Sequence, residues 1–466
     1  MSVLANFWQR SILREMPWRW ALWWLVLPNL AFMVMWPIGG PMMSASMLIC
    51  GTIAIIAVQS ESRIARAITL LMIFLVQLTL YVTSSFNIDF WNVMLLDQYL
   101  AELNPARSPE YVVAGAVVVI AIICSMCFGV RIEKMNNRNQ FLGAFALVAM
   151  LVNADAAATF GTRGTYKTVA PDDAPVDSAI LQTAISPRSV AADNLVVIMV
   201  ESWGVPSNPF ERALDEDIWA LDRVASRYAV QRGVSTYYGS TTNAEVREWC
   251  SLWGDHMSTD FDKVDCLPER FRQAGFRTVA YHSFNDEFFD RGEWYPKIGF
   301  DVSHFDEDLL GRGARHCDGV FPGACDPDVP RIIAEDLRNS PSKRNLVYWL
   351  TLNAHLPVPP DETFGTQECS LGSREWSDAF PMLCRSYKVH QEVADSIVEQ
   401  IMDPAFPEAD LLIVGDHMPP FFQRTIRTRF DSAHVPWIYL ENRAARRQAA
   451  DPAAEVSQTY PGPSVG

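Results

Sequence analysis

The sequence predicts a chain of two parts: five N-terminal transmembrane helices, then an extracytoplasmic α/β domain with a mainly parallel central sheet. The distribution of charge is the first observation behind this prediction. Residues 1–160 carry 9 basic and 8 acidic side chains, whereas residues 161–466 carry the other 29 and 46, a net charge of −17. The first third is therefore apolar and nearly neutral, and the rest is acidic. Because this balance lacks the basic face of a nucleic-acid binder, no nucleic acid is expected as a partner.

Long runs without charge predict the membrane spans. No charged residue occurs between Arg19 and Glu61, and a Pro-Ile-Gly-Gly-Pro sequence at residues 37–41 interrupts this run near its middle. About 20 apolar residues are the length that crosses a bilayer as a helix. The predicted spans are residues 20–37, 42–60, 67–88, 111–130 and 139–154.

Basic residues in the loops predict the orientation of these spans. Eight Lys and Arg residues lie in the N-terminus and in the second and fourth loops, whereas the first and third loops carry only Arg107. This asymmetry places the N-terminus in the cytoplasm, and five crossings then place everything after about residue 157 outside it. We expect a transmembrane domain at 1–157, a linker at the outer membrane surface at 158–190, the α/β domain at 191–443 and a disordered tail at 444–466.

Six cysteines follow the predicted spans, and an even number in an oxidising compartment indicates disulfides. Six cysteines allow 15 pairings, of which we expect the scheme that joins sequence neighbours. The alternative is a cysteine zinc site, although the spacing lacks paired C-x-x-C ligands. The expected pairs are Cys250 with Cys266, Cys317 with Cys325, and Cys369 with Cys384.

Apolar runs of strand length alternate with helical stretches in the second part of the chain. This alternation is typical of an α/β domain whose sheet is mainly parallel. In such sheets ligands bind at the edge where the strands have their carboxyl ends, so the residues after each strand carry the chemistry. The predicted strands are residues 195–200, 278–281, 346–350, 411–414 and 436–440, and the clearest helical stretches are 214–229 and 386–402.

Polar residues at three of these strand ends, and in one loop, predict a metal site. Glu201 follows the first strand, Asp416 and His417 follow the fourth, and Thr241 lies in a glycine-led loop. Each signal alone has an ordinary reading, since a Glu after a strand is often a helix cap and Asp-His pairs are common. Together, oxygen donors and one imidazole suit Mn²⁺ or Zn²⁺. A metal beside the Thr hydroxyl would make that hydroxyl a nucleophile.

The motifs at these positions resemble those of a known group of enzymes. They resemble the lipid-headgroup transferases of the alkaline-phosphatase (sulfatase-like) superfamily, such as lipoteichoic acid synthase, the phosphoglycerol transferase of periplasmic glucans and the phosphoethanolamine transferases of lipid A. Members of that group also have five N-terminal spans and an extracytoplasmic domain. The motifs are Val200-Glu201-Ser202-Trp203, Gly239-x-Thr241-x-Asn243-x-Glu245, Asn353-x-His355 and Gly415-Asp416-His417.

The resemblance implies roles for individual residues. Glu201, Thr241, Asp416 and His417 would hold one divalent metal, Zn or Mn, with a second metal possible. Thr241 would be the nucleophile, and Thr242 is the alternative. Four residues would bind substrate: His355, Arg291, Phe289 (where lipoteichoic acid synthase has a Trp) and Asn243.

The resemblance also implies a reaction and a location. A phosphoalcohol, phosphoethanolamine or phosphoglycerol, would pass from a membrane phospholipid through a phosphothreonine to an envelope glycan or glycolipid. The enzyme would lie in the bacterial inner membrane with its catalytic domain facing the periplasm. The alternatives are a phosphodiesterase or phosphatase that uses water, and a non-catalytic envelope scaffold. The C-x-P-S-R motif of sulfatases does not occur, and neither a P-loop nor a G-x-G-x-x-G motif supports a nucleotide donor.

Overall fold

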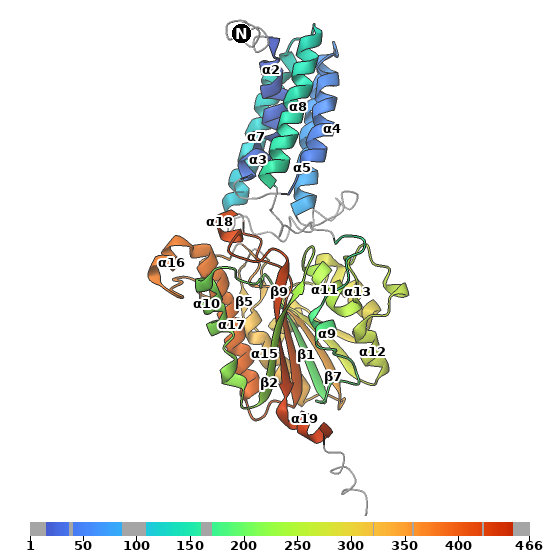
Figure 1. Cartoon of the computed structure of the whole chain (residues 1–466), viewed down its shortest axis with the longest axis vertical. Helices are drawn as coiled ribbons and strands as arrows, with labels where there is room; N and C mark the ends of the chain where they lie inside the picture. The colour runs from blue at the N-terminus through green and yellow to red at the C-terminus, as the bar shows by residue number, and fades with distance from the viewer. Residues whose placement is uncertain are drawn as a thin grey trace, which may run out of the picture. The chain divides into compact units, whose positions relative to one another are not determined.

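The computed structural model describes residues 15–36, 41–85, 109–159, 170–319, 321–356, 358–421 and 424–450. The chain divides into two compact units, one with the N-terminal helices and one with the sheet. Both units are drawn in Figure 1. The predicted tail lies outside the described residues from residue 451 onward.

The first unit is a bundle of apolar helices that follow the charge-free runs of the sequence (Figure 1). Among the described residues, two helices are long and apolar enough to cross a membrane, Arg63–Tyr81 and Arg138–Thr159. Ser44–Ala57 and Gly115–Arg131 are also apolar but shorter. The helices are α2 (Trp18–Trp20), η1 (Ala21–Val26), α3 (Leu27–Met35), α4 (Ser44–Ala57), α5 (Arg63–Ser85), α7 (Pro109–Phe128) and α8 (Arg138–Thr159), with a short η4 (Gly129–Arg131).

A buried carboxylate ties the start of α4 to α8 within this bundle. Asp155, on α8, is almost fully buried. It accepts hydrogen bonds from Met43 N at 2.9 Å, Ser44 Oγ at 2.8 Å and Trp36 Nε1 at 2.9 Å. The first N–H groups of a helix have no partner within the helix, and an acidic side chain there satisfies one of them. Asp155 therefore fixes where α4 begins.

The second unit is built on a seven-stranded sheet with the order β2-β9-β8-β1-β7-β3-β4. The five strands from β8 to β4 are mutually parallel, and β9 is antiparallel to both β8 and β2. The mainly parallel sheet and all five predicted strands are confirmed. The strands are β1 (Asn194–Val200), β2 (Tyr228–Thr236), β3 (Arg277–His282), β4 (Val302–His304), β7 (Asn345–Leu350), β8 (Ala409–Gly415) and β9 (His434–Asn442).

Helices cover both faces of the sheet (Figure 1). One face packs against α9 (Ala179–Gln182), α11 (Thr241–Cys250), α12 (Leu267–Gln273) and α13 (Arg291–Ile298). On the other side lie α10 (Pro209–Ile218), α15 (Val329–Arg338) and α17 (Pro381–Met402). Residues from the end of the segment predicted as a linker belong to the first of these layers, namely Ala179, Ile180, Ile185 and Val190.

Two predicted segments differ in the structure. The helix expected at 214–229 begins earlier, as α10, because Asn208 caps it and Pro209 takes the first helical position. It ends before β2 starts at Tyr228. A helix, α19 (Arg443–Ala450), occupies the start of the predicted tail, since Asn442 Oδ1 accepts from the N–H groups of the next helical residues. The remaining elements are η5 (Leu221–Val224), η6 (Phe261–Lys263), η7 (Phe288–Asp290), α14 (Asp306–Gly311), β5 (His316–Cys317), β6 (Gly323–Ala324), η8 (Asp326–Asp328), α16 (Arg374–Ala379) and α18 (Arg424–Arg427).

The six cysteines of the second unit form three disulfides. The pairs join Cys250 to Cys266, Cys317 to Cys325, and Cys369 to Cys384. The expected scheme of sequence neighbours is therefore confirmed, and the cysteine zinc site is wrong. The free cysteines, Cys50, Cys124 and Cys127, lie in the helical bundle.

We predict that the Cys250–Cys266 disulfide contributes about 3 kcal/mol to the stability of the second unit, because it closes a loop of roughly 15 residues in the unfolded chain. Replacing both cysteines by serine should lower the unfolding free energy by this amount. Denaturant unfolding of the full chain in detergent, followed by tryptophan fluorescence, measures the loss. Cys127→Ser, at an exposed free cysteine, is the control. A loss below about 1 kcal/mol for the double variant would contradict the prediction.

Candidate metal-binding and nucleophile site

The parallel pairing of β1 with β8 brings the predicted metal ligands together. Val200, the last residue of β1, pairs with Gly415, the last residue of β8. Glu201 and Asp416 are the next residues of their chains, so they leave the sheet side by side at its carboxyl edge. Gly415 permits this closeness, because a Cβ there would lie 2.0 Å from the carbonyl oxygen of Trp203.

A tight turn presents Thr241 to the same edge. Gly239 has a φ of +80° and lies against Asn243, so a side chain at this position would be strained and would clash. Ser240 then caps α11, whose first residue is Thr241. Asn243 Oδ1 accepts from Ser240 N at 2.8 Å, and its Nδ2 donates to Gly254 O at 2.8 Å. Asn243 was predicted to bind substrate. In the structure its side chain stabilises this turn.

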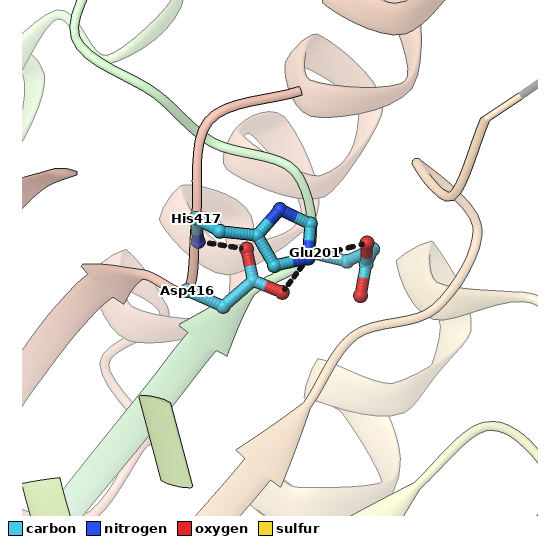
Figure 2. A group of neighbouring side chains, drawn as sticks. All are labelled: Glu201, Asp416 and His417. Carbon is cyan, nitrogen blue, oxygen red and sulfur yellow. Dashed lines mark hydrogen bonds and ion pairs between the residues drawn. The ribbon is translucent and has the colours of Figure 1, made fainter. Parts of the chain in front are cut away.

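Four side chains converge at this edge. Thr241 Oγ1 lies 3.0 Å from Asp416 Oδ2, 3.2 Å from Glu201 Oε2 and 3.3 Å from His417 Nε2. Figure 2 shows how the ring of His417 lies between the two carboxylates. Its Nε2 is 3.2 Å from Asp416 Oδ2 and 3.6 Å from Glu201 Oε1. The structure therefore brings together all four residues that the sequence assigned to the metal.

The charges of this cluster call for a cation. Glu201 and Asp416 are both nearly inaccessible to solvent. Burial raises the pKa of Asp416 well above its usual value, and the negative charge of Glu201 raises it further. Burial also acts to raise the pKa of Glu201, but electrostatic interactions with His417 and His355, together with hydrogen bonds from Ser202 and Asp416, lower that pKa overall. Two buried carboxylates this close cannot both be ionised without a compensating positive charge.

The donor set fits a divalent metal ion. Within the described residues, one ligand atom from each of Glu201, Asp416 and His417 lies within 4.8 Å of the others. His417 Nδ1 is 3.0 Å from Met418 O, and since a carbonyl only accepts, the ring donates there and leaves Nε2 with its lone pair. Carboxylate oxygens with one neutral imidazole match the ligands of Zn²⁺ or Mn²⁺.

His355 lies beside this cluster, within the electrostatic influence of Glu201. Its Nδ1 is 2.9 Å from Leu356 O, and its ring makes an edge contact with Phe321 at 4.6 Å. The loop that carries it is held by Asp326. That buried carboxylate accepts from Leu352 N at 2.8 Å and from Asn353 N at 2.6 Å.

Sequence reasoning missed Asp326. Its carboxylate also accepts from Ser283 Oγ at 2.6 Å, so it joins the ends of β3 and β7. Burial raises the pKa of Asp326 to about 6. The residue follows Cys325 in a short helical turn, far along the chain from both strand ends, and no local pattern marks it. The Asp326 network shows that the histidine loop is fixed by long-range contacts.

Arg291 and Phe289 form a second group with Glu245. The Arg291 guanidinium is buried and pairs with Glu245 Oε2 at 2.9 Å. Tyr348 donates to the other oxygen of this carboxylate at 3.0 Å, and Tyr295 donates to the same oxygen. Phe289 packs its ring 5.2 Å from the guanidinium and has a φ of +59°, which is strained for a side chain of this size. In the structure, Arg291 neutralises Glu245.

We predict that Arg291→Met lowers the unfolding free energy by about 3–5 kcal/mol, because it leaves the charge of the buried Glu245 carboxylate without a compensating cation. The double variant Arg291→Met with Glu245→Gln should recover part of this loss. Denaturant unfolding of the full chain measures both. If Arg291→Met is as stable as the wild type but raises KM for a phosphorylated substrate, Arg291 contacts the substrate anion instead.

The α/β domain of the chain matches a known protein family. A family model described as Sulfatase matches residues 193–458. A search of curated proteins gave no significant match.

Several solved structures are similar, with TM-scores below 0.5. The chain is similar to the lipoteichoic acid synthase LtaP from Listeria monocytogenes at 16% identity and a TM-score of 0.41, over 55% of this chain and 66% of that one, slightly under two thirds. It is similar to lipooligosaccharide phosphoethanolamine transferase A (EptA) from Neisseria meningitidis at 13% identity and a TM-score of 0.47, over 88% of this chain and 83% of that one. It is also similar to the periplasmic domain of EcEptC from Escherichia coli in complex with Zn, at 13% identity and a TM-score of 0.40, over 57% of this chain and 77% of that one. These likenesses are too distant to assign a role to any residue. The family model, by contrast, covers more than half of the chain, and the chain belongs to the sulfatase family of enzymes.

Proposed function

We propose that the protein is a phosphotransferase that moves phosphoethanolamine or phosphoglycerol from a membrane phospholipid to a hydroxyl of an envelope glycan or glycolipid. The observation that carries this proposal is the placement of the Thr241 hydroxyl, 3.0 to 3.3 Å from Asp416, Glu201 and His417. A threonine that only capped a helix would have no need of two buried carboxylates and an imidazole around its hydroxyl. This arrangement supports Thr241 as the nucleophile.

Glu201, Thr241, Asp416 and His417 would hold one divalent metal ion, Zn or Mn. When bound, such an ion lowers the pKa of a hydroxyl and offsets the charge on phosphoryl oxygens. The protein contributes the geometry, because the strand ends and the turn at Gly239 hold all four side chains before substrate arrives.

The transfer proceeds in two displacements at phosphorus. Thr241 Oγ loses its proton and attacks the phosphodiester of the lipid, a new P–O bond forms, the bond to diacylglycerol breaks, and the released diacylglycerol oxygen takes up a proton. The acceptor hydroxyl then loses its proton and attacks the phosphothreonine, the bond to Thr241 Oγ breaks, and Thr241 Oγ regains a proton. His355 lies beside the cluster, and the charge of a substrate phosphate would favour its protonated form, whose Nε2 could donate a hydrogen bond to a phosphoryl oxygen.

The position of Thr241 on α11 also favours a phosphoryl group. Thr241 is the first residue of a ten-residue helix, and the N–H groups at a helix start attract anions. Thr242 is a weaker candidate, because its Oγ1 lies 3.3 Å from Ser240 Oγ, on the capping side of the turn. The geometry therefore favours Thr241 over Thr242.

The apolar helices of the first unit support a membrane location for this chemistry. We propose that the protein crosses the bacterial inner membrane five times, with the N-terminus in the cytoplasm and the sheet domain in the periplasm. The distribution of basic loop residues supports this orientation. Three disulfides in the sheet domain suit the same oxidising compartment. A phospholipid donor would then lie in the bilayer that holds the enzyme.

We predict that Thr241→Ala abolishes headgroup transfer while the domain stays folded, because a covalent nucleophile contributes several orders of magnitude to turnover, whereas the cap of α11 is Ser240 and is unchanged. Turnover of labelled phosphatidylethanolamine and phosphatidylglycerol into glycan and into water measures both transfer and hydrolysis. Thr242→Ala is the matched control and should keep substantial activity. If Thr241→Ala retains more than about a tenth of wild-type turnover, a loss under roughly 1.4 kcal/mol, Thr241 is not the nucleophile.

A further inference from the structure

We infer that Ser202 is a positioning residue, which fixes the oxygen of Glu201 and of Asp416 that faces Thr241. Ser202 lies directly after Glu201 and is fully buried. Its backbone N–H donates to Asp416 Oδ1 at 2.8 Å, and its hydroxyl donates to Glu201 Oε1 at 2.8 Å. One residue therefore binds both carboxylates of the candidate metal site. The inference rests on the proposed function only in taking these carboxylates as metal ligands.

The contacts of Ser202 divide each carboxylate into a held oxygen and a presented oxygen. Asp416 Oδ1 accepts from the N–H groups of Ser202 and His417, at 2.8 and 2.6 Å. The other oxygen, Asp416 Oδ2, faces the site and lies 3.0 Å from Thr241 Oγ1 and 3.2 Å from His417 Nε2. In Glu201 the held oxygen is Oε1 and the presented oxygen is Oε2, at 3.2 Å from Thr241. Each carboxylate would thus offer one oxygen to a metal ion.

The backbone conformation of Ser202 indicates that its hydroxyl contributes a contact that glycine could not make. Its φ is +56°, in the left-handed region that costs a residue with a Cβ and costs glycine nothing. Glycine would keep the N–H contact to Asp416 and relieve this strain. The hydroxyl bond to Glu201 is what glycine could not supply. Contacts of this kind orient metal ligands, and their loss typically weakens metal binding about 10- to 100-fold.

The two effects of Ser202 separate in a pair of variants. Ser202→Ala and Ser202→Gly both remove the hydroxyl, but only Ser202→Gly relieves the positive φ. The measurement is Zn²⁺ binding to the purified full chain after removal of metal, by competition with a coloured chelator, together with the melting temperature of the metal-free protein. We expect both variants to bind Zn²⁺ about 10- to 100-fold more weakly than the wild type. We expect Ser202→Gly to melt at a higher temperature than Ser202→Ala.

The matched control is Ser396→Ala, which removes a serine hydroxyl whose one hydrogen-bond partner among the described residues is Val393 O, within α17. It should bind Zn²⁺ as the wild type does. If Ser202→Gly binds Zn²⁺ within about twofold of the wild type, the hydroxyl does not position Glu201 and the inference is overturned. A wild-type chain that binds no Zn²⁺ would also overturn it. If Ser202→Ala fails to fold, Ser202→Gly alone decides. The assay contains no phospholipid, so a failure of headgroup transfer would contradict the proposed function without changing this result.

Discussion

The structure of the sheet domain depends on one constraint: two carboxylates from neighbouring parallel strands must meet in a buried space beside a hydroxyl. Desolvation and mutual repulsion both oppose this arrangement. The pairing of Val200 with Gly415 enforces it, because Glu201 and Asp416 then follow neighbouring parallel strands at the same position along the sheet edge. Gly415 is required for the same reason, since any side chain there would strike the carbonyl of Trp203. The cluster is therefore held together by backbone packing, and a cation would relieve its charge.

Helix α11 links the nucleophile to the rest of this frame. Arg247, which follows Thr241 on the same helix, is buried, donates to Gly415 O at 3.3 Å and pairs with Glu248 at 2.9 Å. Glu248 in turn accepts from the backbone of Ala179 and Ile180 at the start of α9. The segment that leads into the domain is thus anchored to the helix that presents Thr241. A disturbance of α9 or of the Cys250–Cys266 loop would reach the site through this helix.

Much of the fold and of the site follows from local sequence patterns. The strands β1, β7 and β8 are buried on both faces, so they read as continuous apolar runs, and the residues after them could be assigned directly. Strand β2 was missed because it lies at the sheet edge, where buried and exposed positions mix. Asp326 could not be assigned, because its partners follow strands that are far from it in sequence. Ser202 stood in a motif, but its contact with Asp416 joins residues 214 positions apart. The pairing of Arg291 with Glu245 could not be predicted either, because the two residues are 46 positions apart, although Glu245 stood in a motif and Arg291 was expected to bind substrate.

The central claim is that Thr241 carries the headgroup phosphate between donor and acceptor. The most direct measurement is peptide mapping by mass spectrometry of the full chain, quenched after incubation with phospholipid and no glycan. The account predicts one added phosphoethanolamine or phosphoglycerol group, on the peptide that contains Thr241 and on that residue. It also predicts that a glycan acceptor removes the added group. A modification at another residue, or transfer to glycan at full rate with Thr241 never modified, would contradict the account.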